Sequence, residues 1–126
     1  MKEEYFIITN NPMVYDNLKS NCQVNYIDDV YVEVLKLARD YVHLKHKLLT
    51  HPLAGSIKPN ETPYKSIVIS KNKERLNFCS LNYIENSIDM CKNFVPRTKD
   101  YQQDVLEDFR HIDYSLIESA LASRMN

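Results

Sequence analysis

Short apolar runs of strand length alternate along this chain with longer amphipathic segments of helical spacing. The clearest strand is SIVIS, Ser66–Ser70, and another apolar run, YFIIT, lies near the start at Tyr5–Thr9. Two more runs of strand length are CQVNYI, residues 22–27, and HKLLT, residues 46–50. Alternating strands and helices are typical of α/β proteins with a parallel sheet. The pattern predicts a three-layer α/β sandwich, with a small, mainly parallel sheet of about four strands and helices on both faces.

Capping residues and apolar stripes predict where the first two helices begin. Asn10 or Asn11 can cap a helix that has Pro12 in its first turn. Asp28 or Asp29 can cap a longer helix whose apolar residues recur at intervals of three and four. Both helices follow predicted strands, as the α/β pattern requires.

Three further helices are predicted in the second half of the chain. Ser80 is expected to cap one of them, and Pro96 to stop it. The next is expected over residues 100–110. The last is expected to open at SLIE, where Ser115 and Glu118 have the spacing of a capping box.

The size of the chain limits the number of domains, and its single glycine excludes two common phosphate-binding motifs. A chain of 126 residues fits one domain, which we place at residues 1–126. A Walker loop needs two glycines and a Rossmann fingerprint three, so neither phosphate-binding motif is present. No apolar run approaches the roughly 20 residues of a membrane span, and the N-terminal segment lacks the features of a signal peptide. We therefore expect a soluble, cytoplasmic protein with no membrane partner.

The cysteines and histidines do not form a recognisable metal or catalytic motif. The chain has three cysteines in no CxxC pair, which predicts free thiols in a reducing compartment. Cys79 precedes a predicted helix but has no identifiable catalytic histidine. His43, His46 and His51 lack a carboxylate or cysteine that would complete a metal site. We expect no metal and no other cofactor.

Most of the glycine and proline residues of the chain fall in one stretch, residues 48–70. It holds the only glycine, Gly55, and three of the five prolines. The connection over residues 51–65 is unusually long for a compact domain, and such loops are often functional. Its prolines restrict their own backbone and that of the preceding residues, which lowers the entropy lost on binding. A covering loop whose polar groups cap its own turns is the alternative.

The site is predicted from the topology of open α/β sheets. Ligands bind beyond the C-terminal ends of the strands, where the strand order reverses. If the order begins 2-1-3, the residues that leave the first strand face Thr50 and His51 across one crevice. The candidate ligand-binding residues are Thr9, Asn10, Asn11, Thr50, His51, Gly55, Ser56, Lys58, Asn60, Thr62 and Tyr64.

Charge distribution bears on the partners. Residues 36–75 carry nine Lys or Arg against three Asp or Glu, whereas both ends of the chain are acidic. A basic middle can steer a small anionic ligand; the alternative is a set of solvated faces. The segment SLIESALASR carries a single arginine, a poor surface for a polyanion, so we expect no nucleic-acid partner.

At ITNNP and LLTHPLAGSIKPNETPYKS the chain resembles the GrdX family, small proteins encoded with the glycine reductase genes of amino-acid-fermenting bacteria. The resemblance extends through NSI near residue 87 to LEDFRHIDYSLIESAL near the end. It implies a link to glycine reductase, a selenoprotein system that reductively deaminates glycine to acetyl phosphate. It does not imply catalysis, and no catalytic residue follows from it. The matching motif residues are Thr50, His51, Gly55, Lys58, Pro59, Asn60, Thr62 and Tyr64.

Three functions remain open. The favoured one is a non-catalytic accessory or regulatory protein that binds a small polar or anionic ligand, or a glycine reductase component, through residues 50–64. The second is a small enzyme acting on an anionic metabolite, with His51 as acid/base and Lys58 as its electrostatic partner. The third is a structural subunit that presents an apolar helix face. Ligand identity and oligomeric state stay open.

Overall fold

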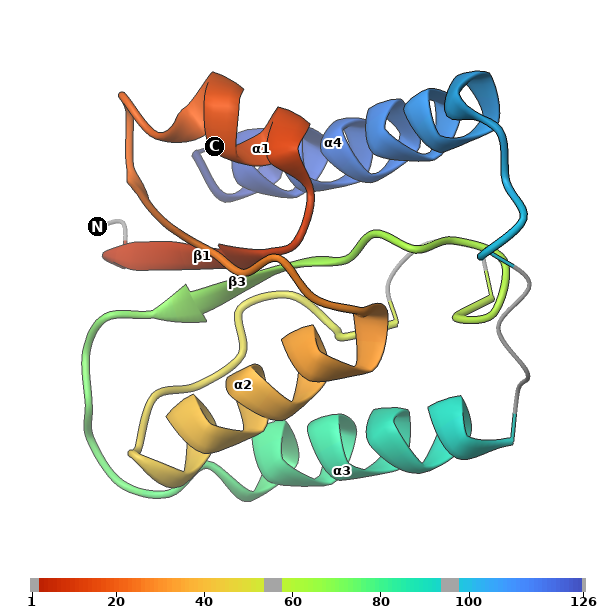
Figure 1. The fold of residues 1–126 in the computed structure, drawn as a ribbon. Coiled ribbons are helices and arrows are strands. Elements are labelled where there is room, and N and C mark those ends of the chain that lie inside the picture. The colour runs from red at the N-terminus through yellow and green to blue at the C-terminus, as the bar shows by residue number, and fades with distance from the viewer. Residues whose placement is uncertain (1–2, 54–57, 94–97, 126) are drawn as a thin grey trace.

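A computed structural model describes residues 3–53, 58–93 and 98–125 of the chain. In these ranges a three-stranded sheet lies between two helical layers (Figure 1). The strands are β1 (Tyr5–Thr9), β2 (Gln23–Tyr26) and β3 (Ser66–Ser70). The helices are α1 (Pro12–Leu18), α2 (Tyr31–His43), α3 (Phe78–Lys92) and α4 (Gln103–Met125). The predicted mixed α/β class is confirmed.

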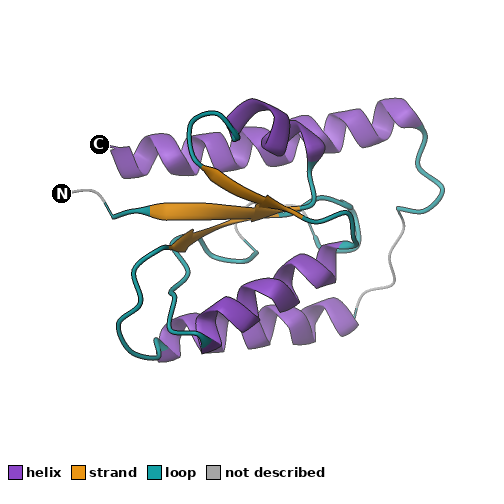
Figure 2. Ribbon diagram, turned by 60° about the vertical axis from the view of Figure 1, so that its left-hand side comes forward, coloured by secondary structure: helices purple, strands orange, loops and turns teal. Residues whose placement is uncertain are grey.

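The central strand β1 divides the core into two parts. Its side chains alternate between the faces of the sheet: Phe6 and Ile8 pack with α2 and α3, and Ile7 packs with α1 and α4. Strand β3 repeats this alternation in SIVIS, and Figure 2 shows the strands enclosed by helices on both sides. The apolar centres of both strands, residues 6–8 of β1 and 67–69 of β3, therefore follow from burial on both faces.

The prediction of a mainly parallel sheet is wrong. The strand order is β2-β1-β3. Strand β2 runs parallel to β1, but β3 runs antiparallel to it, with Ile7 opposite Val68. A parallel return requires a crossover, usually a helix, over one face of the sheet. Helix α2 leads from β2 to residues 46–50, which lie antiparallel to β3, and the described parts of the connection from there to β3, residues 51–53 and 58–65, contain no helix.

The predicted strand at residues 46–50 is reduced to a single antiparallel bridge between Leu48 and Ile69. The chain does lie along the edge of β3, because the Leu49 N–H donates to the Val68 carbonyl oxygen at 2.8 Å. The Val68 N–H, however, donates to the Thr50 hydroxyl oxygen at 3.1 Å. A side chain thus takes the position of a strand carbonyl and ends the ladder there.

Helix capping differs from the prediction in α2 and α3. Helix α2 follows Val30, whose side chain makes no cap, although the Asp29 carboxylate accepts the Val30 N–H at 2.7 Å. In α3 the cap is Asn77, whose side-chain oxygen accepts the Ser80 N–H at 2.8 Å. Ser80 therefore lies within the helix, and its hydroxyl accepts the Leu48 N–H at 3.0 Å.

The two predicted C-terminal helices are one continuous helix, α4, of 23 residues. Gln103–Met125 contains neither proline nor glycine, so nothing in the backbone stops it. Ser115 is exposed within the helix and caps nothing. No helix in the described ranges has both the length and the apolar character needed to cross a membrane.

Leu116→Pro distinguishes one long helix from two. If a helix began at Ser115, position 116 would be its first turn, where proline is favoured. In the continuous α4 we expect proline there to lower the free energy of unfolding by about 3 kcal/mol or more, measured by urea denaturation. Leu116 is 41% exposed, so Leu116→Ala is the control and should change stability little. Equal stability of the two variants would contradict a continuous α4.

Candidate functional site

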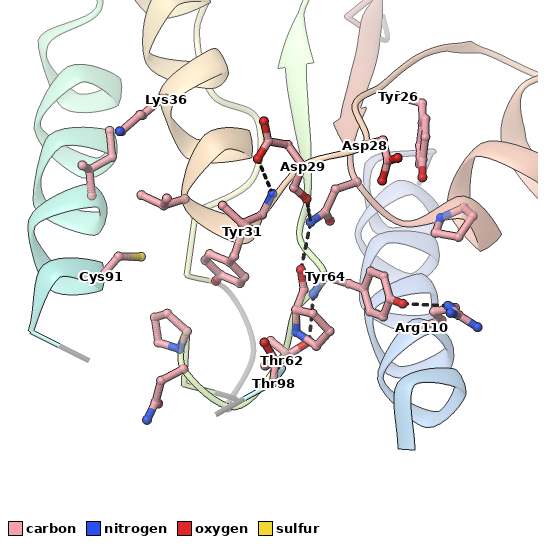
Figure 3. A pocket seen from close by; sticks show the side chains of 18 of the residues that line it. Tyr26, Asp28, Asp29, Tyr31, Lys36, Thr62, Tyr64, Cys91, Thr98 and Arg110 are labelled. Atoms are coloured by element: carbon pink, nitrogen blue, oxygen red, sulfur yellow. Dashed lines mark hydrogen bonds between the residues drawn. The ribbon is translucent and has the colours of Figure 1, made fainter. Parts of the chain in front are cut away.

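A cavity of about 630 Å³ opens beyond the C-terminal ends of β1 and β2. Its walls include the β2–α2 connection, the first turn of α2, residues 59–64 and the end of α3. In Figure 3, Lys36 and Cys91, from α2 and α3, lie on one side and Arg110 of α4 lies on the other. Sites for small molecules usually measure roughly 300–1,000 Å³, so the cavity has the size of such a site.

Asn10 holds the walls of this cavity together. It is buried immediately after β1, and its side-chain Nδ2 donates to the Asp29 carbonyl at 2.9 Å and to the Pro63 carbonyl at 2.8 Å. Its Oδ1 accepts the Lys65 N–H at 2.8 Å. Both amide protons and the amide oxygen are therefore occupied. Asn10 fixes the β2–α2 connection and the segment before β3 to the end of β1.

A buried chain of hydrogen bonds lies beside Asn10 and reaches α4. The Asp113 carboxylate accepts from the Ser66 hydroxyl at 2.7 Å and from Asn11 Nδ2 at 3.0 Å. Because the one Ser66 proton is used, the Thr9 hydroxyl must donate to Ser66 Oγ, at 2.7 Å. Thr9 Oγ1 in turn accepts the Asn11 N–H at 2.9 Å. These polar side chains satisfy one another.

Two ionisable groups are buried at this end of the sheet. Burial raises the pKa of Asp113, against the opposing effects of its hydrogen bonds and of the Lys65 charge. Burial lowers the pKa of Lys65, and the charges of Asp113 and Cys91 oppose that shift. The Lys65 ammonium forms no hydrogen bond or close ion pair with any residue that the structure describes. The Lys65 and Asp113 charges thus favour each other at this end of the sheet and oppose the effects of burial on both groups.

Arg110 and Tyr64 form one side of the cavity. Arg110 Nε donates to the Tyr64 hydroxyl at 2.8 Å, and the guanidinium carbon lies 5.4 Å from the centre of the Tyr64 ring (Figure 3). In the described part of the chain Arg110 has no carboxylate partner within 4 Å. Its remaining N–H groups are therefore available to an anion.

Asn60 is the one described residue with a buried side-chain oxygen that has no hydrogen-bond partner there. It is 7% exposed and lines the cavity. A buried acceptor without a donor costs on the order of 1–3 kcal/mol. Such atoms are rare in folded proteins, and a donor from a bound ligand is one physical reason for them.

A second cavity, of about 380 Å³, is lined by Thr50, His51 and the first turn of α3. The His51 ring lies 4.9 Å from that of Tyr83. His51 Nδ1 accepts the Leu53 N–H at 3.0 Å, so neutral His51 carries its proton on Nε2. The exposed Cys79 thiol lines the same cavity. Nowhere in the described ranges do three His, Cys, Asp or Glu side chains gather as metal ligands.

The structure divides the predicted site residues into several groups. Those that line the larger cavity are Asn10, Asn60, Thr62 and Tyr64. Those that line the second cavity instead are Thr50 and His51. Those buried in the hydrogen-bond chain are Thr9 and Asn11.

The structure gives a position for only one of the other three predicted residues. Lys58 is exposed and lines neither. Gly55 and Ser56 lie outside the described residues. The single crevice expected between the residues that leave β1 and Thr50–His51 is not formed, because β3 lies between β1 and residues 46–50, and Asn10 and His51 line two different cavities. Whether any of these residues binds a ligand stays a prediction.

The sequence analysis did not predict Arg110 or Asp113, nor that Asn60 has a buried side-chain oxygen without a partner in the described residues. One signal was available for Asp113. It lies four residues before Ile117 and eight before Leu121, so it occupies the apolar stripe of α4. An acidic residue on such a stripe is buried with partners. The capping-box spacing at Ser115 concealed this, because it divided α4 into two shorter helices.

Comparison with protein families gives a match to the GrdX-like protein family over residues 6–122. The chain belongs to the GrdX-like family. The resemblance seen in the sequence is therefore confirmed. Comparison with the curated proteins, and with the solved structures, gave no significant match.

The match covers the whole site of this GrdX-like chain. Residues 6–122 run from β1 through most of α4. They include every residue that lines the larger cavity and the whole hydrogen-bond chain from Thr9 to Asp113. The cavity is therefore built entirely from the part of the chain that the family description covers.

Substitutions of Asp113 distinguish how its hydrogen bonds and its buried charge each affect the stability of this GrdX-like protein. Asp113→Asn keeps an oxygen that can accept from Ser66 and Asn11 and removes the charge. Because burial raises the pKa of Asp113, ionisation destabilises the wild type as pH rises from about 4. We expect Asp113→Asn to be at least as stable as wild type at neutral pH, with the advantage disappearing at low pH.

Asp113→Leu is the matched variant that removes the acceptor. It leaves the Ser66 hydroxyl and the Asn11 amide without a partner, so we expect it to lose roughly 2 kcal/mol or more of unfolding free energy. Denaturation at several pH values measures both variants. If Asp113→Asn were destabilised as much as Asp113→Leu, the negative charge itself, through Lys65, would be what stabilises this end of the sheet.

Proposed function

We propose that this GrdX-like protein is a non-catalytic, cytoplasmic accessory or regulatory protein, and that it binds a small polar or anionic ligand in the larger cavity. Membership of the family supports an association with the glycine reductase system. Co-purification of glycine reductase components with the tagged chain, from a cell that expresses both, tests that association. The ligand-binding part of the proposal rests on the structure of the cavity.

The orphaned oxygen of Asn60 is the observation that carries the proposal. Its Oδ1 is buried and without a partner in the described residues, in the wall of a cavity of ligand size. Asn10, by contrast, uses both of its side-chain N–H groups and its side-chain oxygen in hydrogen bonds. The cavity thus combines a preorganised frame with one unsatisfied acceptor, and preorganisation lowers the entropic cost of binding.

The binding segment is narrower than residues 50–64. Five residues of this segment line the larger cavity, namely Pro59, Asn60, Thr62, Pro63 and Tyr64. The backbone of the segment is held by the bond from the Tyr101 hydroxyl to the Glu61 carbonyl, at 2.9 Å, and by Asn10. Thr62 Oγ1 already accepts the Tyr64 N–H at 3.2 Å. Asn60 thus has an unused acceptor and Arg110 has unused donors, whereas the Thr62 hydroxyl already accepts a bond and Lys58 lies outside the cavity.

The enzymatic alternative has less support from the geometry. A general base must offer a free lone pair, and His51 already uses Nδ1 to accept a backbone N–H. Lys58, its proposed electrostatic partner, does not line the cavity that holds His51. No observation favours the structural-subunit alternative over ligand binding.

Asn60→Leu is expected to separate binding from folding. A panel of amino acids, 2-oxo acids, acyl phosphates and nucleotides can be screened by thermal shift; a ligand at 100 times its dissociation constant stabilises by about 2.7 kcal/mol. Asn60→Leu should reduce the affinity of a hit by roughly 1 kcal/mol, without lowering the stability of the free protein, because it removes a buried atom with no partner.

Asn82→Leu is the matched control, since Asn82 is exposed on α3 and lines neither cavity. It should leave the affinity of the same hit unchanged. A hit whose affinity is the same in wild type and Asn60→Leu would mean that the ligand binds elsewhere. A large loss of stability in free Asn60→Leu would mean that Asn60 has a structural role.

His51→Ala tests the absence of catalysis. We expect wild type and His51→Ala to leave every bound metabolite chemically unchanged, because His51 and the larger cavity are separate. Mass spectrometry of the panel after prolonged incubation measures this. Conversion that is accelerated by wild type but not by His51→Ala would establish the enzymatic alternative.

A further inference from the structure

We propose that the larger cavity takes an anionic molecule of about nucleotide size, which carries a planar ring and, apart from its anionic group, an N–H or O–H donor. This inference rests on the proposed function and narrows the class of its ligand. It follows from the volume of the cavity, the rings in its walls, the free cation on one side and the orphaned acceptor.

The larger cavity is too large for the smallest candidate ligands to fill it well. A water molecule takes about 30 Å³ of liquid, so 630 Å³ corresponds to roughly 20 waters. Glycine has only five non-hydrogen atoms and would displace only a few of them. Inorganic phosphate is of similar size. Either would leave most of the cavity to water, whereas well-formed sites bury most of the surface of their ligand.

Rings make up much of the wall. The cavity residues with rings are Pro12, Tyr26, Tyr31, Pro59, Pro63 and Tyr64. Tyr31 is only 8% exposed, and the Tyr64 hydroxyl is held by Arg110, so these two rings are fixed before a ligand arrives. Flat rigid walls of this kind match a planar ring, which they contact at little entropic cost.

The cation that faces an anion is Arg110. Its one side-chain bond in the described ranges goes to Tyr64, a neutral group, and Asp28 in the same cavity forms no ion pair with it. Lys36, also in the wall, is already paired with Glu33 at 3.3 Å. A carboxylate or phosphate on the ligand would therefore meet a guanidinium with unused donors, the geometry in which arginine binds anions best.

Asn60 adds a requirement that a simple oxyanion does not meet. Its Oδ1 can only accept a hydrogen bond, and a fully ionised carboxylate has no proton to donate. A ligand that satisfies this oxygen must therefore present a separate N–H or O–H group. Asp28, an exposed acceptor beside Tyr26 (Figure 3), suits further donors such as hydroxyls.

Protein-observed NMR titration tests this ligand class. Adenosine monophosphate and indole-3-acetate represent anions with a ring and a donor. Adenosine, inorganic phosphate and glycine represent the ring alone, the anion alone and the small zwitterion. We expect at least one ring-bearing anion to shift the amide signals of residues 59–64 and to bind about ten-fold or more tightly than any of the last three probes.

Arg110→Gln and Arg75→Gln form a matched pair for the charge. Arg75 is exposed and lines neither cavity. Arg110→Gln should reduce the affinity of the ring-bearing anion about ten-fold or more, toward that of its uncharged counterpart, and Arg75→Gln should leave it unchanged. If Arg110→Gln had no effect on a ligand that Asn60→Leu weakens, the anionic part of the inference would be wrong.

The remaining outcomes distinguish the inference from the function on which it rests. If glycine or phosphate shifted the same amides and bound at least as tightly as both ring-bearing anions, the ligand class would be wrong and the binding function would stand. If none of the five probes shifted the amides of the cavity walls, the ligand class would be wrong, and a negative thermal-shift screen as well would remove the binding function.

Discussion

The side chain of Asn10 is the interaction on which the rest of this structure depends. The sheet has only three described strands, and its central strand ends at a point where two long connections must be held. Through three side-chain hydrogen bonds, Asn10 joins β1 to the β2–α2 connection and to the segment that enters β3. An amide is well suited to this place because it offers donors and an acceptor on one rigid plane. Both connections contribute residues to the walls of the cavity, and Asn10 fixes their positions relative to β1.

The two faces of the sheet differ at this end in how completely their polar groups are paired. On one face, Thr9, Ser66 and Asp113 form a closed hydrogen-bond chain that leaves little for a ligand. On the other side of Asn10, the cavity has Asn60 without a donor and Arg110 without an acid in the described residues. Polar groups that are fully satisfied stabilise a fold, whereas those left unsatisfied reduce its stability until something binds. This contrast supports the proposal that the cavity, and not the opposite face, binds a ligand.

Local sequence patterns predicted much of the fold but not its long-range pairing. The runs at Tyr5–Thr9 and Ser66–Ser70 are strands because β-branched residues buried on both faces leave few alternatives. The direction of β3 was not predictable from its own residues, because it depends on the path of the connection before it. Thr50 was predicted to face a ligand, but it forms a hydrogen bond with β3, a contact that spacing alone does not reveal. Asn60 and Tyr64, which the sequence singled out in the proline-containing connection before β3, line the larger cavity, and their role in binding stays a prediction.

Helix α4 places Arg110 and Asp113 within one turn of each other, and Asn11 Nδ2 contacts the backbone of the first and the carboxylate of the second. The insertion of a single residue in this turn would rotate everything after it by about 100°. Asp113 would then leave the sheet, and Ile117 and Leu121 would leave the core. Related chains should therefore differ in length at the exposed segment over residues 71–75, while the length of α4 between Arg110 and Leu121 stays constant.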